Sequence, residues 1–141
     1  MTPEKMIQSK IISYLSKLAD EGHPIFYERR QAGGFAYKKG LPDLYIVYNG
    51  KHIEVEVKRP GGQLSSMQET WARRFKQLGI THYVADDISK FKLFMKEIMK
   101  LWMSILKKCG DGTAKSHSEC SLLVVMRVAE KLLLQERYLN S

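Results

Sequence analysis

The dipeptide Asn49-Gly50 is the feature of this sequence that most constrains its fold. It separates a run of apolar and aromatic residues over 44–48 from a segment in which Ile53, Val55 and Val57 alternate with ionisable residues. Asn-Gly is the pair preferred in two-residue hairpin loops, because both loop positions need a positive φ. We therefore predict a β-hairpin in which Tyr48 pairs with Lys51.

The register of this hairpin would bring ionisable side chains together. Counting back from the loop places Asp43 directly opposite Glu56. Because side chains alternate along a strand, Glu54, Glu56 and Lys58 share one face, and the apolar residues of the strand share the other. Carboxylates facing each other at roughly 5 Å destabilise a sheet unless something positive lies between them. A hard divalent cation with oxygen ligands is the natural candidate, and Lys58 could then orient an attacking water and stabilise charge in the transition state.

The segments around the hairpin predict further helices and strands. Thr2 and Pro3 are typical of a helix start, and Ser65 with Gln68 fits a capping box. The expected helices cover 3–21, 66–78, 88–108 and roughly 119–138, and the expected strands cover 23–30, 41–48, 51–58 and 80–85. This order predicts an α/β fold with a central mixed β-sheet flanked by helices, and extra helices at the C-terminal end.

The domain organisation expected from these elements is simple. Residues 1–108 would form one domain, 109–118 a linker, and 119–141 a C-terminal helix of unknown role. In the helix over 88–108, apolar residues recur in alternating steps of three and four, which fits packing on the sheet or contact with a second subunit. Cys109, His117 and Cys120 match no standard zinc spacing.

The charge of the chain favours an anionic partner. The net charge is +8 and the pI about 9.5, with 44% hydrophobic residues. No long apolar segment or signal-like start is present, so we expect nucleic acid rather than a membrane, and a cytoplasmic setting. The candidate phosphate contacts are basic residues around the predicted site: Arg29, Arg30, Lys38, Lys39, Arg59, Arg73 and Arg74. The glycine-rich loop over 31–40 suits phosphate contact or is simply a mobile basic loop.

The hairpin residues also carry a family resemblance. Leu41-Pro42-Asp43 followed by Glu56-Val57-Lys58 resembles the PD-(D/E)xK nuclease signature. The surrounding sequence narrows this to the virus-type replication-repair nuclease (VRR-NUC) domain. The matching stretches, over about residues 4–91, are Gly40-Leu-Pro-Asp-Leu, Glu56-Val-Lys-Arg-Pro-Gly-Gly-Gln-Leu-Ser, Gln68-Glu-Thr-Trp and Leu78-Gly79.

This resemblance implies a restriction-endonuclease-like core and a metal-dependent DNA endonuclease using Mg²⁺ or Mn²⁺. Asp43 and Glu56 would bind the metal together with the Val57 backbone carbonyl, and Lys58 would serve the attacking water. Gln68 corresponds to a helical glutamine close to the active site. Glu4 corresponds to a first-helix glutamate near the metal, on the basis of its spacing alone.

The resemblance further implies the small stand-alone type of this domain, as found in phages and bacteria. Such domains tend to be homodimers that cut branched DNA, such as a four-way (Holliday) junction or a flap, in DNA repair. The expected setting is thus the cytoplasm of a bacterial or phage-infected cell. The alternatives are a non-catalytic nucleic-acid-binding module, a sequence-specific restriction-like endonuclease, or a hairpin whose charged face is merely solvated. Glu54, an extra carboxylate, could be a second metal contact, a partner for an arginine, or an exposed rim residue.

Overall fold

The computed structural model describes residues 1–30 and 38–110. The chain divides into two compact units, Met1–Phe91 and Lys92–Ser141. In chain order the elements are α1 (Pro3–Asp20), β1 (Ile25–Arg29), β2 (Leu44–Tyr48), β3 (Lys51–Val57), α2 (Ser66–Gln77), β4 (Thr81–Ala85) and α3 (Ile88–Gly110).

The predicted hairpin is confirmed in both its turn and its register. Strands β2 and β3 are antiparallel, and Tyr48 lies opposite Lys51. Asn49 and Gly50 have φ values of 47° and 79°, as a two-residue loop with both positions at positive φ requires. Every side chain of the hairpin therefore lies on the face predicted for it.

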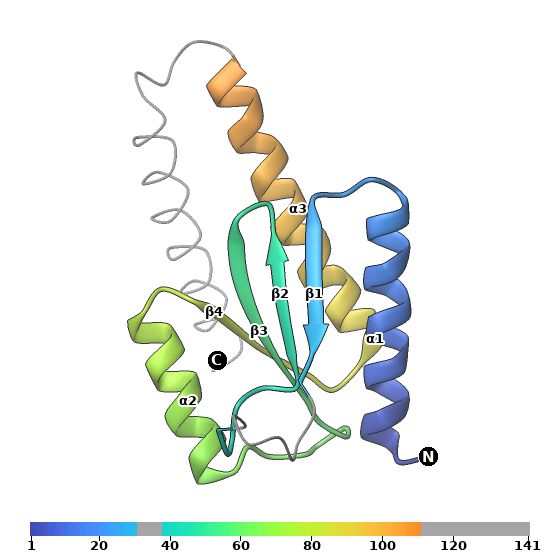
Figure 1. Ribbon diagram of the computed structural model, residues 1–141, viewed down its shortest axis with the longest axis vertical. Coiled ribbons are helices and arrows are strands. Elements are labelled where there is room, and N and C mark those ends of the chain that lie inside the picture. Colours follow the sequence, from blue (N-terminus) through green and yellow to red (C-terminus); the bar gives the residue numbers. More distant parts are fainter. Residues whose placement is uncertain (31–37, 111–141) are drawn as a thin grey trace. The chain divides into compact units, whose positions relative to one another are not determined.

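The four strands form one mixed sheet in the order β1-β2-β3-β4 (Figure 1). β1 and β2 are antiparallel, and so are β2 and β3, whereas β3 and β4 run parallel. A parallel pair cannot be joined by a tight turn, and α2 provides the crossover from β3 to β4. The predicted α/β fold with a central mixed sheet is therefore confirmed.

One face of the sheet forms the hydrophobic core of the first unit. Its strand residues are fully buried, and they are Leu44, Ile46, Ile53 and Val55. Helix α1 contacts β1 and β3 and contributes Ile11 and Leu15. The ring of Phe91 packs against Tyr14 edge-on and lies 6.1 Å from Tyr83 between ring centroids.

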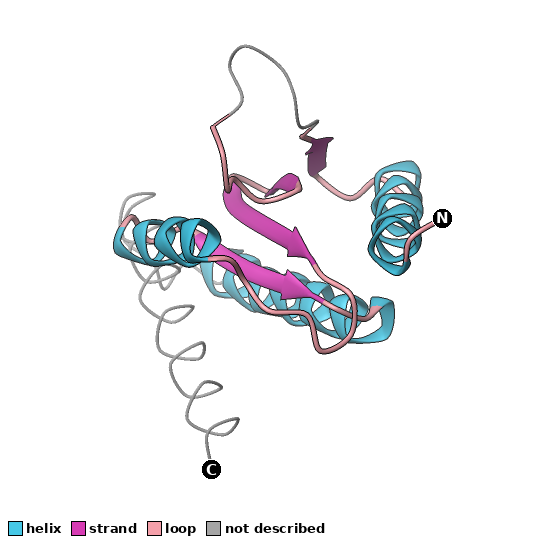
Figure 2. Ribbon diagram, turned by 90° about the horizontal axis from the view of Figure 1, so that it is seen from below, coloured by secondary structure: helices cyan, strands magenta, loops and turns pink. Residues whose placement is uncertain are grey.

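The other face carries the polar residues and is covered only in part. Helix α2 contacts β4, where Phe75 stacks on His82 with the ring centroids 6.1 Å apart. Figure 2 views the sheet from the end at which β2 begins and β3 ends. Met67 in α2 and Leu78 directly after it are 48% and 64% exposed, because the helix lies mainly over one strand of the sheet.

The helix starts follow their capping residues. The Thr2 side chain accepts a hydrogen bond from Lys5 N, and Ser65 and Gln68 form the reciprocal capping box. Before α3, Asp87 Oδ1 accepts hydrogen bonds from the backbone N–H groups of Ser89 and Lys90 at 2.7 and 3.0 Å. Short polar side chains thus satisfy N–H groups that have no partner inside the helix.

Several predictions concern parts of the chain that the structure does not describe. The loop over 31–37 and the final helix near 119–138 lie outside the described residues, as do His117 and Cys120. Helix α3 continues to Gly110, two residues past the predicted end. The domain limits and the role of the apolar seam of α3 remain predictions. Among residues 1–30 and 38–110, no helix is both long enough and apolar enough to cross a membrane.

Candidate active site at the open end of the hairpin

Asp43 lies immediately before β2, where the hydrogen-bonded ladder with β3 has ended. Its carboxylate turns toward β3, and Oδ2 accepts a hydrogen bond of 2.8 Å from Val57 N. Its backbone carbonyl accepts a hydrogen bond of 2.9 Å from the N–H of Arg30. Arg30 follows β1, which lies on the opposite side of β2 from β3. The side chain is therefore held at the end of β3, beside Glu56.

Glu56 is 3% exposed and is bound by two donors. Its Oε1 accepts a hydrogen bond of 2.6 Å from Gln68 Nε2 and lies 3.1 Å from Lys58 Nζ. Gln68 comes from the first turn of α2, and Lys58 follows β3 directly. The structure thus brings together all four residues predicted to be catalytic, including Asp43.

The electrostatics of the site show that its negative charge is only partly neutralised. Burial, together with the charge of Asp43, raises the pKa of the Glu56 carboxyl from 4.5 to about 7 against the opposing effect of Lys58. Burial also raises the pKa of Asp43, while the Val57 N–H and Lys58 lower it. A bound cation would favour the ionised form of both carboxyls.

The donor atoms suit a hard divalent cation. In contacts with described residues, Asp43 accepts only through Oδ2, and Glu56 meets its partners only through Oε1. Each carboxylate therefore keeps one oxygen that has no partner among these residues. Within the described ranges, no cluster of three or more His, Cys, Asp or Glu side chains could hold a metal. The described residues therefore offer two carboxylates at this site, those of Asp43 and Glu56. This matches Mg²⁺, which uses one or two carboxylates and completes its octahedron with water and phosphate oxygens.

Glu4 lies near the site but is held by a different contact. The side chain is exposed, and Oε1 accepts a hydrogen bond of 3.3 Å from Arg59 N. Its charge contributes to the raised pKa of both Asp43 and Glu56, which shows that it is close to them. The structure does not join Glu4 to these two carboxylates in a ligand set, and its role as a ligand remains a prediction.

Gln68 belongs both to the predicted capping box and to the predicted site, and its side-chain amide serves both roles. Its Oε1 accepts a hydrogen bond of 2.9 Å from Ser65 N, closing the capping box, while its Nε2 donates to Glu56. The start of α2 and the candidate site are therefore joined through one side-chain amide.

The segment that leads into Pro42-Asp43 is fixed against α2, which sequence reasoning missed. Trp71 Nε1 donates a hydrogen bond of 3.1 Å to the Lys39 carbonyl. Gly40 has a φ of 82°, and a Cβ added there would come within 2.5 Å of Met67 Cγ. The Gly40-Leu-Pro-Asp motif is a signal for this close approach, but its partner on α2 could not be read from the sequence.

Glu54 is the partner of an arginine, one of the three possibilities left open. It is 1% exposed and lies on the same face of β3 as Glu56. Both guanidinium NH groups of Arg30 donate to it, one of them at 2.7 Å, and His52 Nε2 lies 2.7 Å from Oε1. Arg30 was predicted to contact DNA phosphate, but its guanidinium is directed into the protein.

The other predicted DNA contacts remain available at the surface. They are exposed in the structure, and they are Arg29, Lys38, Lys39, Arg59, Arg73 and Arg74. Arg74 lies over the Trp71 ring at 5.7 Å from the centroid, and Arg73 donates to Thr70 Oγ1. The carbonyl of Val57 is predicted to be a metal ligand. The backbone N–H of Val57 donates to Asp43 Oδ2, and this hydrogen bond holds Val57 beside Asp43.

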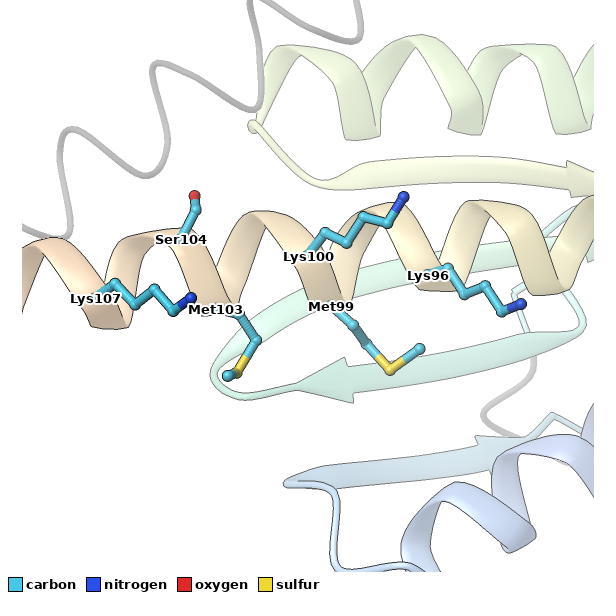
Figure 3. A pocket seen from close by; sticks show the side chains of 6 residues that line it. All are labelled: Lys96, Met99, Lys100, Met103, Ser104 and Lys107. Carbon is cyan, nitrogen blue, oxygen red and sulfur yellow. The ribbon is translucent and has the colours of Figure 1, made fainter.

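A pocket along α3 is separate from these residues. It is lined by Lys96, Met99, Lys100, Met103, Ser104 and Lys107, all from one helix of the second unit (Figure 3). It has no carboxylate or other candidate catalytic group among these lining residues, so the candidate site does not include it.

Comparison with known proteins agrees with the fold and the motif. A model of the VRR-NUC domain family matches residues 8–86, a range that holds Asp43, Glu56, Lys58 and Gln68 but not Glu4. A solved structure described as "VRR_NUC domain" matches with a TM-score of 0.57 and 18% identity, covering 68% of this chain and 97% of that chain. No curated protein matches. Because the family match covers more than half of the chain, the chain belongs to the VRR-NUC domain family and carries a nuclease-type domain.

Proposed function

We propose that this chain is a metal-dependent DNA endonuclease that hydrolyses phosphodiester bonds with Mg²⁺ or Mn²⁺. The observation that carries the proposal is the pair Asp43 and Glu56. Each carboxylate has one oxygen without a partner among the described residues, and the pKa of Glu56 is raised to about 7. A bound divalent cation would polarise the phosphodiester and lower the pKa of a coordinated water.

Each neighbouring side chain has a role that its contacts support. Gln68 fixes Glu56 Oε1, leaving the other oxygen for the metal. Lys58 Nζ lies 3.1 Å from the same Oε1. It can donate to the attacking water and stabilise the negative charge that develops on the phosphate oxygens. The Val57 carbonyl and Glu4 are proposed as further ligands, directly or through water.

The exposed basic residues would hold the DNA backbone. Arg59 follows Lys58, and Arg73 and Arg74 lie on α2 with their side chains exposed. Such contacts give affinity without sequence preference and make binding salt-dependent. Replacing Arg73 and Arg74 by Ala should weaken binding and lower the steepness of the salt dependence by about two units of log–log slope.

The substrate class is a further part of this proposal. We propose branched DNA, a four-way junction or a flap, and a homodimer in which two sites cut two strands symmetrically. The support is the resemblance to small stand-alone domains of this type. Sedimentation equilibrium tests the dimer, and a monomer at micromolar concentration would remove the reason to expect symmetric cutting.

Cleavage of labelled DNA tests the proposed activity. Linear, splayed-arm, flap and four-way substrates are incubated with Mg²⁺ or Mn²⁺ and with EDTA, using wild type, Asp43→Ala and Glu56→Ala. We expect metal-dependent cutting of the branched substrates by wild type and none by the variants, whose DNA binding should survive.

Three outcomes would redirect the proposal. Equal residual cutting by wild type and Glu56→Ala would rule out this site and point to a contaminating nuclease. DNA binding without any metal-dependent cleavage would indicate a binding module. Cutting of linear duplex at one sequence only would indicate a restriction-like enzyme instead of a branch-specific one.

A further inference from the structure

Arg30 makes three kinds of contact at the start of β2. Its backbone N donates to the Asp43 carbonyl at 2.9 Å, and its guanidinium donates to the Pro42 carbonyl at 3.2 Å. The same guanidinium binds both carboxylate oxygens of Glu54. Arg30, the residue directly after the edge strand β1, thus holds the carbonyls of Pro42 and Asp43 and is itself held by β3.

Glu54 is well placed to fix Arg30. Its side chain is 1% exposed, and a bidentate arginine–carboxylate pair has a defined geometry in addition to its charge. His52 Nε2 holds Oε1 of the same carboxylate at 2.7 Å, and the Arg30 guanidinium lies over the Tyr45 ring, 5.6 Å from its centroid. The Arg30 side chain is 24% exposed, so the pair is shielded from most competing water.

Asp43 needs support of this kind because of where it lies. The ladder between β2 and β3 ends at Leu44 paired with Val55, so Asp43 lies one residue beyond it. The contact of Asp43 with β3 is made by its side chain, which is also the predicted metal ligand. The Arg30 contacts therefore fix the backbone that carries this carboxylate, while the Val57 N–H fixes one of its two oxygens.

We propose that the Arg30–Glu54 pair is a positioning device for Asp43. It sets the Pro42–Asp43 peptide so that the free carboxylate oxygen faces the metal position, and neither residue contacts metal or DNA. The inference rests on the proposed function for the identity of the ligand. Loss of hydrogen-bonded support behind a metal ligand typically lowers metal affinity by about 10- to 100-fold.

Metal affinity measured without DNA tests this inference. Mn²⁺ is titrated into wild type, Glu54→Gln and Arg30→Lys, and free Mn²⁺ is followed by electron paramagnetic resonance. Arg30→Lys keeps the charge but cannot reach both carboxylate oxygens and a carbonyl together. Glu21→Gln is the matched control, because Glu21 forms an exposed ion pair with Lys17 within α1.

We expect the Kd for Mn²⁺ to rise about 10- to 100-fold in both variants and to stay unchanged in the control. In cleavage assays the half-saturating metal concentration should rise in parallel, while saturating metal restores kcat. Loss of stability is expected in either case, but a purely structural role would lower kcat at saturating metal and leave the half-saturating metal concentration unmoved. Circular dichroism establishes which variants are folded. If Glu54→Gln is unfolded, the Mn²⁺ affinity of Arg30→Lys alone tests the positioning role.

The outcomes separate this inference from the proposed function. If folded variants bind Mn²⁺ as tightly as wild type, the positioning role is wrong, whether or not the chain is a nuclease. If wild type binds Mn²⁺ and the variants bind it more weakly, yet no DNA is cut, the positioning role stands and the nuclease proposal fails. If wild type binds no Mn²⁺, both are wrong.

Discussion

Glu54 and Glu56 are two buried glutamates on one face of the same strand, and their surroundings differ completely. Glu54 is held by a bidentate arginine and a histidine. Glu56 has a neutral amide and one lysine, and it faces a second carboxylate, Asp43. The first charge is compensated by the protein, whereas the second is compensated only in part.

This difference shows that burial alone does not mark a functional carboxylate. A buried charge that the protein pairs is usually structural, and removing its partner is costly. A buried charge that the protein leaves partly unpaired stores unfavourable electrostatics that a ligand can relieve. The same substitution, Glu→Gln, should therefore have opposite consequences at Glu54 and Glu56.

The largest expected effect is on catalysis at Glu56. Glu56→Gln should lower kcat with saturating Mg²⁺ by at least about 10²- to 10³-fold, since it removes a ligand and the charge that stabilises the reacting metal–water pair. Glu54→Gln, measured in the same way, should keep most of its kcat. Similar losses in both variants at saturating metal would erase the distinction between the two residues.

Stability should show the opposite order. Glu54→Gln leaves the Arg30 guanidinium without its counter-charge and should lower the free energy of unfolding by about 2–3 kcal/mol, somewhat below fully buried pairs because Arg30 keeps part of its exposure. Glu56→Gln should leave stability unchanged or raise it at pH 8, since it removes a repulsive charge. Urea denaturation in EDTA measures both, and a more stable Glu54→Gln would contradict the compensated role.

A third difference concerns pH. In the folded metal-free chain the pKa of Glu56 is raised from 4.5 to about 7, so between these values the folded state binds a proton that the unfolded state has released. The free energy of unfolding should therefore fall as the pH rises from about 4.5 to about 7. Urea midpoints in EDTA across this range should fall less steeply in Glu56→Gln, with the remaining slope due in part to Asp43. Equal slopes in wild type and Glu56→Gln would show that folding does not raise the pKa of Glu56.

The smallest expected effect is at His52. His52→Gln would remove or weaken one contact to Glu54 and leave the two from Arg30, so the loss should be about 0.5–1.5 kcal/mol in the free energy of unfolding. The half-saturating metal concentration should hardly change. A shift as large as that of Arg30→Lys would show that the histidine shares the positioning role.

Local signals allowed much of this structure to be predicted. Asn49-Gly50 set the register, and that register placed Asp43, Glu56 and Lys58 together. Caps with a defined chemistry marked the starts of α1 and α2. Each of these features depends on residues a few positions apart, or on a count from a two-residue loop.

The remaining features depend on contacts between distant segments. Arg30 and Glu54 are 24 positions apart, and Arg30 follows β1, which is not a neighbour of β3 in the sheet, so nothing local predicts their pairing. Arg30 therefore seemed no different from Arg29, which is exposed. Trp71 likewise fits a helical apolar pattern, and only the tertiary structure reveals its hydrogen bond to the Lys39 carbonyl.

The amide of Gln68 has a consequence for how this site can vary. At one end it must accept a hydrogen bond from Ser65 N, and at the other it must donate one to Glu56. Glutamate would complete the capping box as well but would add a third negative charge, and lysine would neutralise Glu56 but leave Ser65 N without its acceptor. Local helix stability and the charge of the reaction centre are thus coupled at one position, and neither can be changed there without affecting the other.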